Sequence, residues 1–168
     1  MMALDIIRTE DKTVTDRLAR LGFSSVLYAD KNGRLYGLND VDPFELSVYG
    51  GKDYEFIIRK GKADAVTDTD ANGFLLNKGL CSKLKENKMF VLFKFSSLVR
   101  SENFFRCYKN FMINGRVCNE YSVNCLFVSF AGEKMDVKSP LQLEYFARQF
   151  GYNYNNFVKA QEALIKRI

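Results

Sequence analysis

The segment "DAVTDTDANG" at residues 64–73 carries three aspartates whose carboxylates could bind a metal ion: Asp64, Asp68 and Asp70. Carboxylate oxygens are ligands that Mg²⁺ prefers. Asp5, within the apolar run "ALDII", could add a fourth carboxylate. Such a set would suit a free-standing metal-dependent barrel phosphoesterase. A polar loop between a strand and a helix has the same composition, however, and this second interpretation is better supported.

The chain of 168 residues contains no histidine. It therefore has no imidazole general base, no Ser–His or Cys–His nucleophile pair and no zinc site of the usual kind. Its glycines form neither a P-loop nor a G-x-G-x-x-G fingerprint. The sequence predicts no catalytic residue and no metal or other cofactor.

Positive charge is concentrated in the C-terminal part of the chain. Residues 1–93 contain 14 Lys or Arg and 14 Asp or Glu, whereas residues 94–168 contain 11 Lys or Arg and 6 Asp or Glu. A basic region of this kind suits a polyanion such as nucleic acid, although solvated surface charge has the same pattern. The candidate contacts in this region are Arg100, Arg106, Lys109 and Arg116.

The run "KSPLQLEYFARQFG" at residues 138–151 predicts a helix with a defined start and stop. Ser139 can cap the first turn, Gln142 stands at the capping-box spacing, and Gly151 can end the helix. Lys138 precedes this helix, so its charge lies at the positive end of the helix dipole. The free N–H groups and the lysine would form a phosphate-sized site, which makes Lys138 and Ser139 candidate RNA contacts. A cap with no ligand is the alternative.

A second helix, predicted at residues 102–114, has an aromatic side and a basic side. Because its aromatic residues recur at helical spacing, we expect them to face the core and the basic side to face solvent or phosphate. Aromatic rings that face inward cannot stack on bases, so we expect only backbone contacts from this helix. The expected inner residues are Phe104, Phe105, Tyr108, Phe111 and Met112, and the outer residues are Arg106, Lys109 and Asn110.

Strands and helices alternate along most of the chain, which favours an α/β fold with parallel pairing. The Asn32-Gly33 pair predicts a hairpin. A full (β/α) barrel has about 250 residues, so we expect a contracted, TIM-like barrel with about seven mostly parallel strands, helices outside and one domain at 1–168. An open doubly wound sheet is the alternative. We expect strands at 3–7, 24–30, 34–38, 46–50, 54–61, 89–95 and 123–130, with the segment "ADAVTD" at 63–68 following the strand at 54–61. We expect helices at 10–21, 74–87, 102–114, 139–150 and 154–167.

The four cysteines contain no C-x-x-C pair, and the first residues lack the pattern of a secretory signal peptide. We therefore expect buried free thiols and a reducing, intracellular compartment. The strongest apolar run, "MFVLF" at 89–93, is too short to cross a membrane, so no membrane partner is expected.

About residues 63–165 resemble the thirty-kilodalton protein subunit of ribonuclease P, an archaeal and eukaryotic family. The family has a strand ending in Asp, a helix with an early Asn, a strand, a Ser-Leu turn and a basic helix. It closes with a strand ending in Ser and Ala, an Arg-Ser-Pro helix start and an Ala-bearing last helix. The matching residues are Asp64, Asn77, Ser97, Leu98, Arg106, Lys109, Ser129, Ala131, Ser139, Pro140, Gly151 and Ala160.

Two positions depart from the family's pattern. Lys138 replaces the usual Arg, which keeps the charge but loses the bidentate fork. Phe130 stands where the family commonly has Gly, which raises the question of how that turn is formed. The chain is also short for the family.

The resemblance implies a barrel related to the PHP metal-dependent phosphoesterases, used here as a noncatalytic RNA-binding subunit. The RNA of ribonuclease P removes 5′ leaders from precursor tRNA, and the related MRP particle processes rRNA. The implied partners are this RNA, a smaller ferredoxin-like protein subunit and other ribonuclease P or MRP proteins. The implied location is the nucleus, including the nucleolus, in a eukaryote or the cytoplasm in an archaeon.

Overall fold

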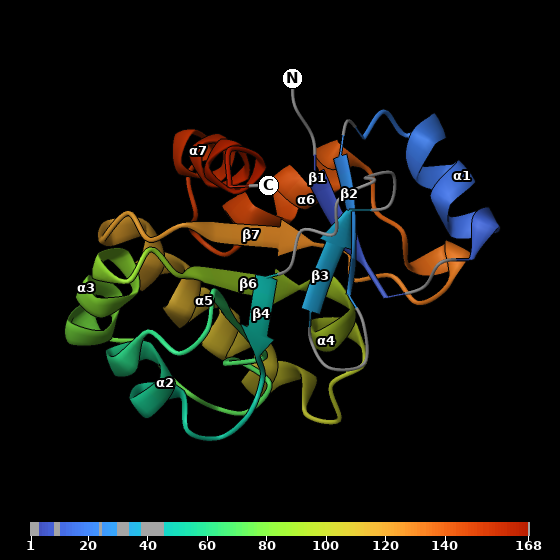
Figure 1. Ribbon diagram of the computed structural model, residues 1–168. Coiled ribbons are helices and arrows are strands. Elements are labelled where there is room, and N and C mark those ends of the chain that lie inside the picture. The colour runs from blue at the N-terminus through green and yellow to red at the C-terminus, as the bar shows by residue number, and fades with distance from the viewer. Residues whose placement is uncertain (1–3, 9–10, 24, 30–33, 38–45, 168) are drawn as a thin grey trace.

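The computed structural model describes residues 4–8, 11–23, 25–29, 34–37 and 46–167 (Figure 1). The strands are β1 (Leu4–Ile7), β2 (Ser25–Ala29), β3 (Arg34–Gly37), β4 (Leu46–Tyr49), β5 (Ala65–Thr67), β6 (Phe90–Lys94) and β7 (Cys125–Val128). The helices are α1 (Lys12–Arg20), α2 (Tyr54–Lys60), α3 (Lys78–Glu86), α4 (Phe95–Val99), α5 (Phe104–Glu120), α6 (Pro140–Gln149) and α7 (Tyr154–Ile165), with a short 3₁₀ helix η1 (Lys134–Asp136).

The strands lie side by side in the order in which they occur along the chain, from β1 to β7. Strand β3 is antiparallel to β2 and β4, and all the other neighbouring pairs are parallel. The prediction of an α/β fold with mostly parallel strands is therefore confirmed. The chain after β7 also reaches β1, because Ile7 forms a parallel bridge with Ala131 and the Arg8 N–H donates to the Ala131 carbonyl at 2.9 Å.

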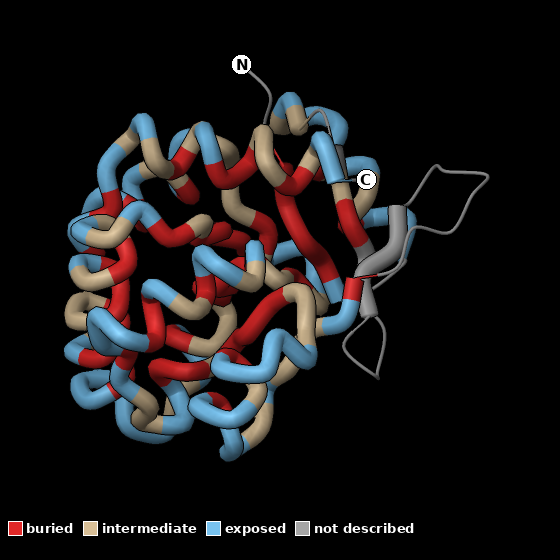
Figure 2. The backbone as a smooth tube through the Cα atoms, turned by 60° about the vertical axis from the view of Figure 1, so that its left-hand side comes forward, coloured by how far each residue is buried: buried red, intermediate tan, exposed pale blue. Residues whose placement is uncertain are grey.

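Both faces of the sheet are covered by apolar side chains, as the continuous apolar runs of parallel strands require. On one face Leu126 and Val128 of β7 pack with Ala160 and Leu164 of α7. The other face packs against α2, α3, α5 and α6, where the Phe93 and Phe127 rings stack at 4.7 Å. Figure 2 shows the buried positions running through the strands and the exposed ones gathered on the outer turns. Figure 1 shows α7 on the opposite side of β6 and β7 from α2 and α3.

The expected strand at 54–61 is wrong, because these residues form helix α2. Three of its apolar residues, at 56–58, are consecutive in the sequence, yet the two residues that are buried, Tyr54 and Ile58, stand four residues apart on one helix face. Gly61 ends the helix in the left-handed conformation, with φ 60°. A second difference is α4, a short helix directly after β6 that the sequence analysis did not predict.

The orientation expected for the basic helix is wrong in part. Helix α5 runs to Glu120, and Phe104 and Phe105 at its start are exposed, whereas Asn110 is buried. The buried face instead contains Cys107, Phe111, Asn114 and Cys118, which follow the i, i+4, i+7, i+11 spacing. Asn110 is buried because its amide binds the loop after β5. The rest of the expected orientation is confirmed, because Phe111 is buried, Tyr108 and Met112 pack against the core, and Arg106 and Lys109 are exposed.

Several local predictions are confirmed. Helix α6 begins with a capping box, in which the Gln142 N–H donates to the Ser139 hydroxyl and the Ser139 N–H donates to the Gln142 side chain. Gly151 follows this helix with φ 78°. The antiparallel pairing of β2 with β3 agrees with the predicted hairpin, whose Asn32-Gly33 turn lies outside the described residues. All four cysteines are free and buried.

In the described part of the chain, no helix has the length and apolar character of a membrane span.

Candidate functional site

The carboxyl ends of the parallel strands β5, β6 and β7 bring together the most unusual polar contacts of the protein. In α/β folds, binding sites form at this end of the sheet because the loops after the strands converge there. Asp68, directly after β5, has φ 58°, and Phe130, just after β7, has φ 50°. Left-handed backbone at residues other than glycine costs about 1–3 kcal/mol each and clusters at functional sites. Lys88 and Ser122, which precede β6 and β7 at the opposite end, also have positive φ. The side-chain contacts of Asp68 and Phe130, described next, therefore identify the candidate site.

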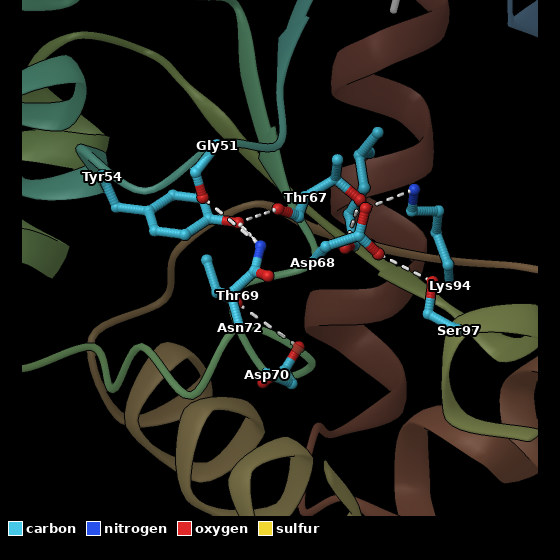
Figure 3. Close-up of polar contacts among 10 residues, drawn as sticks. Gly51, Tyr54, Thr67, Asp68, Thr69, Asp70, Asn72, Lys94 and Ser97 are labelled. Carbon is cyan, nitrogen blue, oxygen red and sulfur yellow. Dashed lines mark hydrogen bonds and ion pairs between the residues drawn. The ribbon is translucent and has the colours of Figure 1, made fainter. Parts of the chain in front are cut away.

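A buried ion pair lies at the centre of this edge (Figure 3). The Lys94 ammonium, at the end of β6, is 2.6 Å from the Asp68 carboxylate and 4.1 Å from the centroid of the Phe130 ring. Ser97 of α4 donates to the other oxygen of Asp68 at 2.7 Å. The turn at Phe130 thus has a backbone conformation that glycine favours, and the Phe130 ring covers the lysine.

The loop after β5 is held by hydrogen bonds to two helices (Figure 3). The Tyr54 hydroxyl of α2 donates to the Thr67 carbonyl at 2.8 Å and accepts from the Asn72 amide at 2.8 Å. Burial raises the pKa of Tyr54 to about 12, so the phenol stays a donor. From α5, Asn114 donates to the Asp70 carboxylate at 2.7 Å. The loop is therefore fixed on both sides of Asp68.

Asp70 is buried within this loop, with 1% of its surface exposed. Its carboxylate accepts from Asn114 and Thr69, and its backbone carbonyl accepts from Asn110 at 2.9 Å. Burial raises the pKa of Asp70 to about 7, against the lowering effect of the Asn114 hydrogen bond. Asp70 therefore connects the loop to α5, and its oxygens are already used.

Asp5 and Asp64 make contacts of their own, away from the Lys94–Asp68 pair. The buried Asp5 carboxylate accepts from the Ser129 N–H at 2.7 Å and from the Ser129 hydroxyl, which ties β1 to the end of β7. Burial raises the pKa of Asp5 to about 7. Asp64 precedes β5 at the opposite end of the sheet, where it accepts from Ser47 and pairs with Arg167.

The four aspartates considered for a metal site are thus engaged in separate contacts. Within the part of the chain that the structure describes, no three His, Cys, Asp or Glu side chains are placed to hold a metal ion together. Asp68 and Asp70 do share the loop after β5, but Asp68 binds the Lys94 ammonium and Asp70 binds asparagine amides.

A cleft of about 410 Å³ opens beside the buried ion pair. It begins at Ser97, which also binds Asp68, and extends along the loop between α4 and α5. Arg106 lies over Gly73 closely enough that a Cβ at this glycine would be 2.6 Å from Nη2. The polar residues of its lining are Ser97, Arg100, Ser101, Glu102, Asn103 and Arg106. This cleft combines two guanidinium groups with hydroxyl and amide groups.

The predicted RNA contacts fall into two groups. Arg100 and Arg106 line the cleft, and Arg100 also pairs with Asp136 of η1 at 2.5 Å. Lys109 and Arg116 are exposed further along α5. Positions 105, 109 and 116 follow one stripe of an α-helix, since each residue turns the helix by about 100°. We call these three residues, Phe105, Lys109 and Arg116, together with the adjacent Arg106, the α5 ridge.

Lys138 and Ser139 are engaged at the start of α6. The Lys138 ammonium lies 4.6 Å from the centroid of the Phe95 ring, and the Ser139 hydroxyl accepts from Gln142. Lys138 therefore rests against α4, and Ser139 serves as the cap of α6. Arg116 lies at the far end of α6, where a Cβ at Gly151 would be 2.6 Å from its Cγ. The predicted RNA-binding residues therefore do not share one pocket. They lie at the end of α4, along α5 and at the start of α6.

Two features of the site were missed in the sequence. The Lys94–Asp68 pair could have been suspected from the lysine that ends the apolar run "FVLFK", because a charge in a buried strand needs a partner. The exposed Phe105 could have been found by placing the small and apolar residues at 107, 111 and 118 on the buried face. Comparison of the chain with models of known protein families finds no match, and comparison with curated proteins finds no match.

Proposed function

We propose that this protein is a noncatalytic RNA-binding subunit of a ribonuclease P-like ribonucleoprotein, built on a contracted (β/α) barrel of the PHP kind. Two features support the barrel. The strands follow one another in chain order, and the first strand meets the chain after the last one at Ile7–Ala131 and Asp5–Ser129. A closed (β/α) barrel has both features, because its strands follow one another in chain order and its first and last strands pair.

The observation that carries the RNA-binding proposal is the unneutralised charge of the α5 ridge. Among the described residues, no carboxylate pairs with Arg106, Lys109 or Arg116, whereas the Lys94 and Arg100 charges are paired with Asp68 and Asp136. The ridge extends over about 16 Å, from 1.5 Å of rise per residue. Phosphates of an RNA backbone would supply the missing negative charge along this length.

The resemblance to the ribonuclease P subunit supplies the remaining parts of the proposal. In this proposal the RNA removes tRNA 5′ leaders and the protein helps it adopt its active shape. The protein partners would be a smaller ferredoxin-like subunit and other ribonuclease P or MRP proteins. The particle would lie in the nucleus or nucleolus of a eukaryote, or in the cytoplasm of an archaeon. Within the described residues, no contact favours a free-standing phosphoesterase, because Asp68 already binds Lys94 and Ser97.

The test is purification of the tagged protein from its native cells, with sequencing of any bound RNA. We expect one abundant structured RNA and several proteins, among them a small ferredoxin-like one. The triple variant Arg106→Ala/Lys109→Ala/Arg116→Ala should recover less of this RNA. A control of equal charge change is Lys60→Ala/Lys78→Ala/Lys85→Ala, at exposed positions of α2 and α3. A protein purified alone, with magnesium-dependent phosphatase activity, would favour the phosphoesterase.

A further inference from the structure

Two phenylalanines at the start of α5 are exposed beside the cleft. Phe105 is 83% exposed and Phe104 is 45% exposed. They lie between Asn103 and Arg106, which both line the cleft. Exposure of a large apolar side chain to water is unfavourable. An exposed apolar patch with a polar rim is typical of a contact surface.

The two rings are supported by a chain of aromatic contacts that begins in the core. Phe150 contacts Tyr108 at 5.1 Å between ring centroids, and Tyr108 contacts Phe104 at 5.8 Å. Phe104 meets Phe105 edge to face, at 5.8 Å and 76°. Because Phe150 is buried, these ring contacts connect the exposed Phe105 to the core. Binding of a partner at Phe105 would therefore cost little conformational entropy of these side chains.

The charges around Phe105 indicate the chemistry of its partner. Arg106 is its neighbour in the chain and Lys109 stands one helical turn later, and neither pairs with a carboxylate among the described residues. Glu102 is the single acid between residues 94 and 119, against five Lys or Arg. A partner that fits this surface must present a flat apolar face together with regularly spaced negative charge. Single-stranded RNA has both, because unpaired bases offer their faces and each nucleotide has a phosphate.

We propose that Phe105, supported by Phe104, is a stacking platform for an unpaired base of single-stranded RNA, whose flanking phosphates contact Arg106 and Lys109. This inference rests on the proposed RNA-binding function and deepens it. It also reverses the sequence-based expectation that α5 contacts only the RNA backbone. Stacking tolerates any base, because every base has a π-face. Duplex RNA should gain nothing from the platform, because its bases are already stacked within the helix.

The binding experiment compares a fluorescein-labelled short oligouridine with an RNA duplex of the same length, by anisotropy. Phe105→Ala should weaken binding of the single strand by about 5- to 150-fold, the range for one stacked base. Phe105→Trp should bind as the wild type does. Phe56→Ala removes a similarly exposed phenylalanine from α2 and should leave binding unchanged. None of these variants should change duplex binding or the salt dependence, since no charge is removed.

A second measurement needs no variant. Photo-crosslinking of the wild type to an oligonucleotide containing 4-thiouridine should label the tryptic peptide 101–106, which holds both phenylalanines. If the wild type does not bind either RNA at physiological salt, the proposed function and this inference both fail. If the wild type binds but Phe105→Ala binds equally well and the peptide is unlabelled, only the stacking platform is overturned. A monomer from Phe105→Ala where the wild type forms a dimer by light scattering would show instead that a second copy covers the patch.

Discussion

At the scale of single residues, the candidate site depends on a lysine that a carboxylate and an aromatic ring enclose. Lys94 is 9% exposed, so its charge is tolerated only because Asp68 and Phe130 lie against it. Ion pairs of this kind are costly to break, because the remaining partner is a buried charge without compensation. Whether they add stability over an apolar replacement is a separate question, which a double-mutant cycle can answer.

Asp68→Asn should lower the free energy of unfolding by about 2–3 kcal/mol, less than the about 3–5 kcal/mol of a fully buried pair. The discount follows from the side-chain exposure of Asp68, 24%. Asparagine tolerates the left-handed backbone at this position, so the change in stability reports the charge and not the strain. Adding Lys94→Met should restore most of the stability. Urea unfolding of the two single variants and the double variant measures this, and additive effects would show that the pair is not coupled.

The buried Asp5 carboxyl should make stability depend on pH. Burial raises the pKa of Asp5 from its ordinary value of 3.8 to about 7, so the folded protein holds this proton more tightly than the unfolded chain does. Its contribution to stability is full below about pH 4 and is lost as the pH rises towards 7, by at most about 1.4 kcal/mol per pH unit.

Asp5→Asn removes this titration and keeps an oxygen that can accept from Ser129. The stability of the variant relative to the wild type should therefore increase between pH 4 and pH 7. Urea melts of both proteins at several pH values provide the comparison. Asp16→Asn, at an exposed position on α1, is the control for the loss of one carboxylate. A difference that decreases over this range would contradict the assigned direction of the shift.

At the scale of elements, α6 combines a cap with a deeply packed face. Ser139→Ala should cost about 1 kcal/mol, because the Gln142 N–H loses its acceptor. Phe146→Ala should cost about 3–5 kcal/mol, because this ring packs against Phe95, Phe111 and Phe127 and its removal leaves a cavity. Urea melts that rank the two variants in the opposite order would contradict the assigned orientation of α6.

Elements whose ends carry their own signals were predictable from the sequence, and those that depend on tertiary contacts were not. Ser139 and Gln142 mark the start of α6 and Gly151 follows its end, so the cap and the stop of this helix could be read from the local sequence alone. Helix α2 was not, because its apolar residues Phe56, Ile57 and Ile58 are consecutive, as in a short strand, and only the packing of Tyr54 and Ile58 selects the helix. Part of the face of α5 was assigned wrongly for a related reason.

Buried asparagines explain the error at α5. Asn110 and Asn114 point inward because the loop after β5 offers a carbonyl and a carboxylate to their amides. A sequence pattern ranks asparagine as an outer residue, since it cannot show partners that lie 40 or more residues away. The Lys94–Asp68 pair escaped detection in the same way, because its members end different strands.

At the scale of the whole molecule, the α5 ridge predicts how RNA binding responds to salt. Arg106→Ala/Lys109→Ala/Arg116→Ala should weaken binding, and the slope of log K against log salt should flatten by at most about 0.7–0.9 for each phosphate that is no longer neutralised. The weakening should be similar on unrelated RNAs of like size, because phosphate contacts fix position and not sequence. A filter-binding salt series measures the slope, with circular dichroism as the control for folding. An unchanged slope with unchanged affinity would mean that these charges are only solvated.

The contact between β1 and the end of β7 has a consequence for the order of events during synthesis. Asp5 and Ser129 are 124 residues apart in the chain. At about 5–20 residues per second, the ribosome produces the second partner about 6–25 s after the first. During that interval the outer edge of β1 has unpaired backbone groups and could pair with another nascent chain. We therefore expect β1 to be among the last strands to complete its pairing. The protein should be most prone to misassembly on crowded polysomes, where nascent chains lie close together.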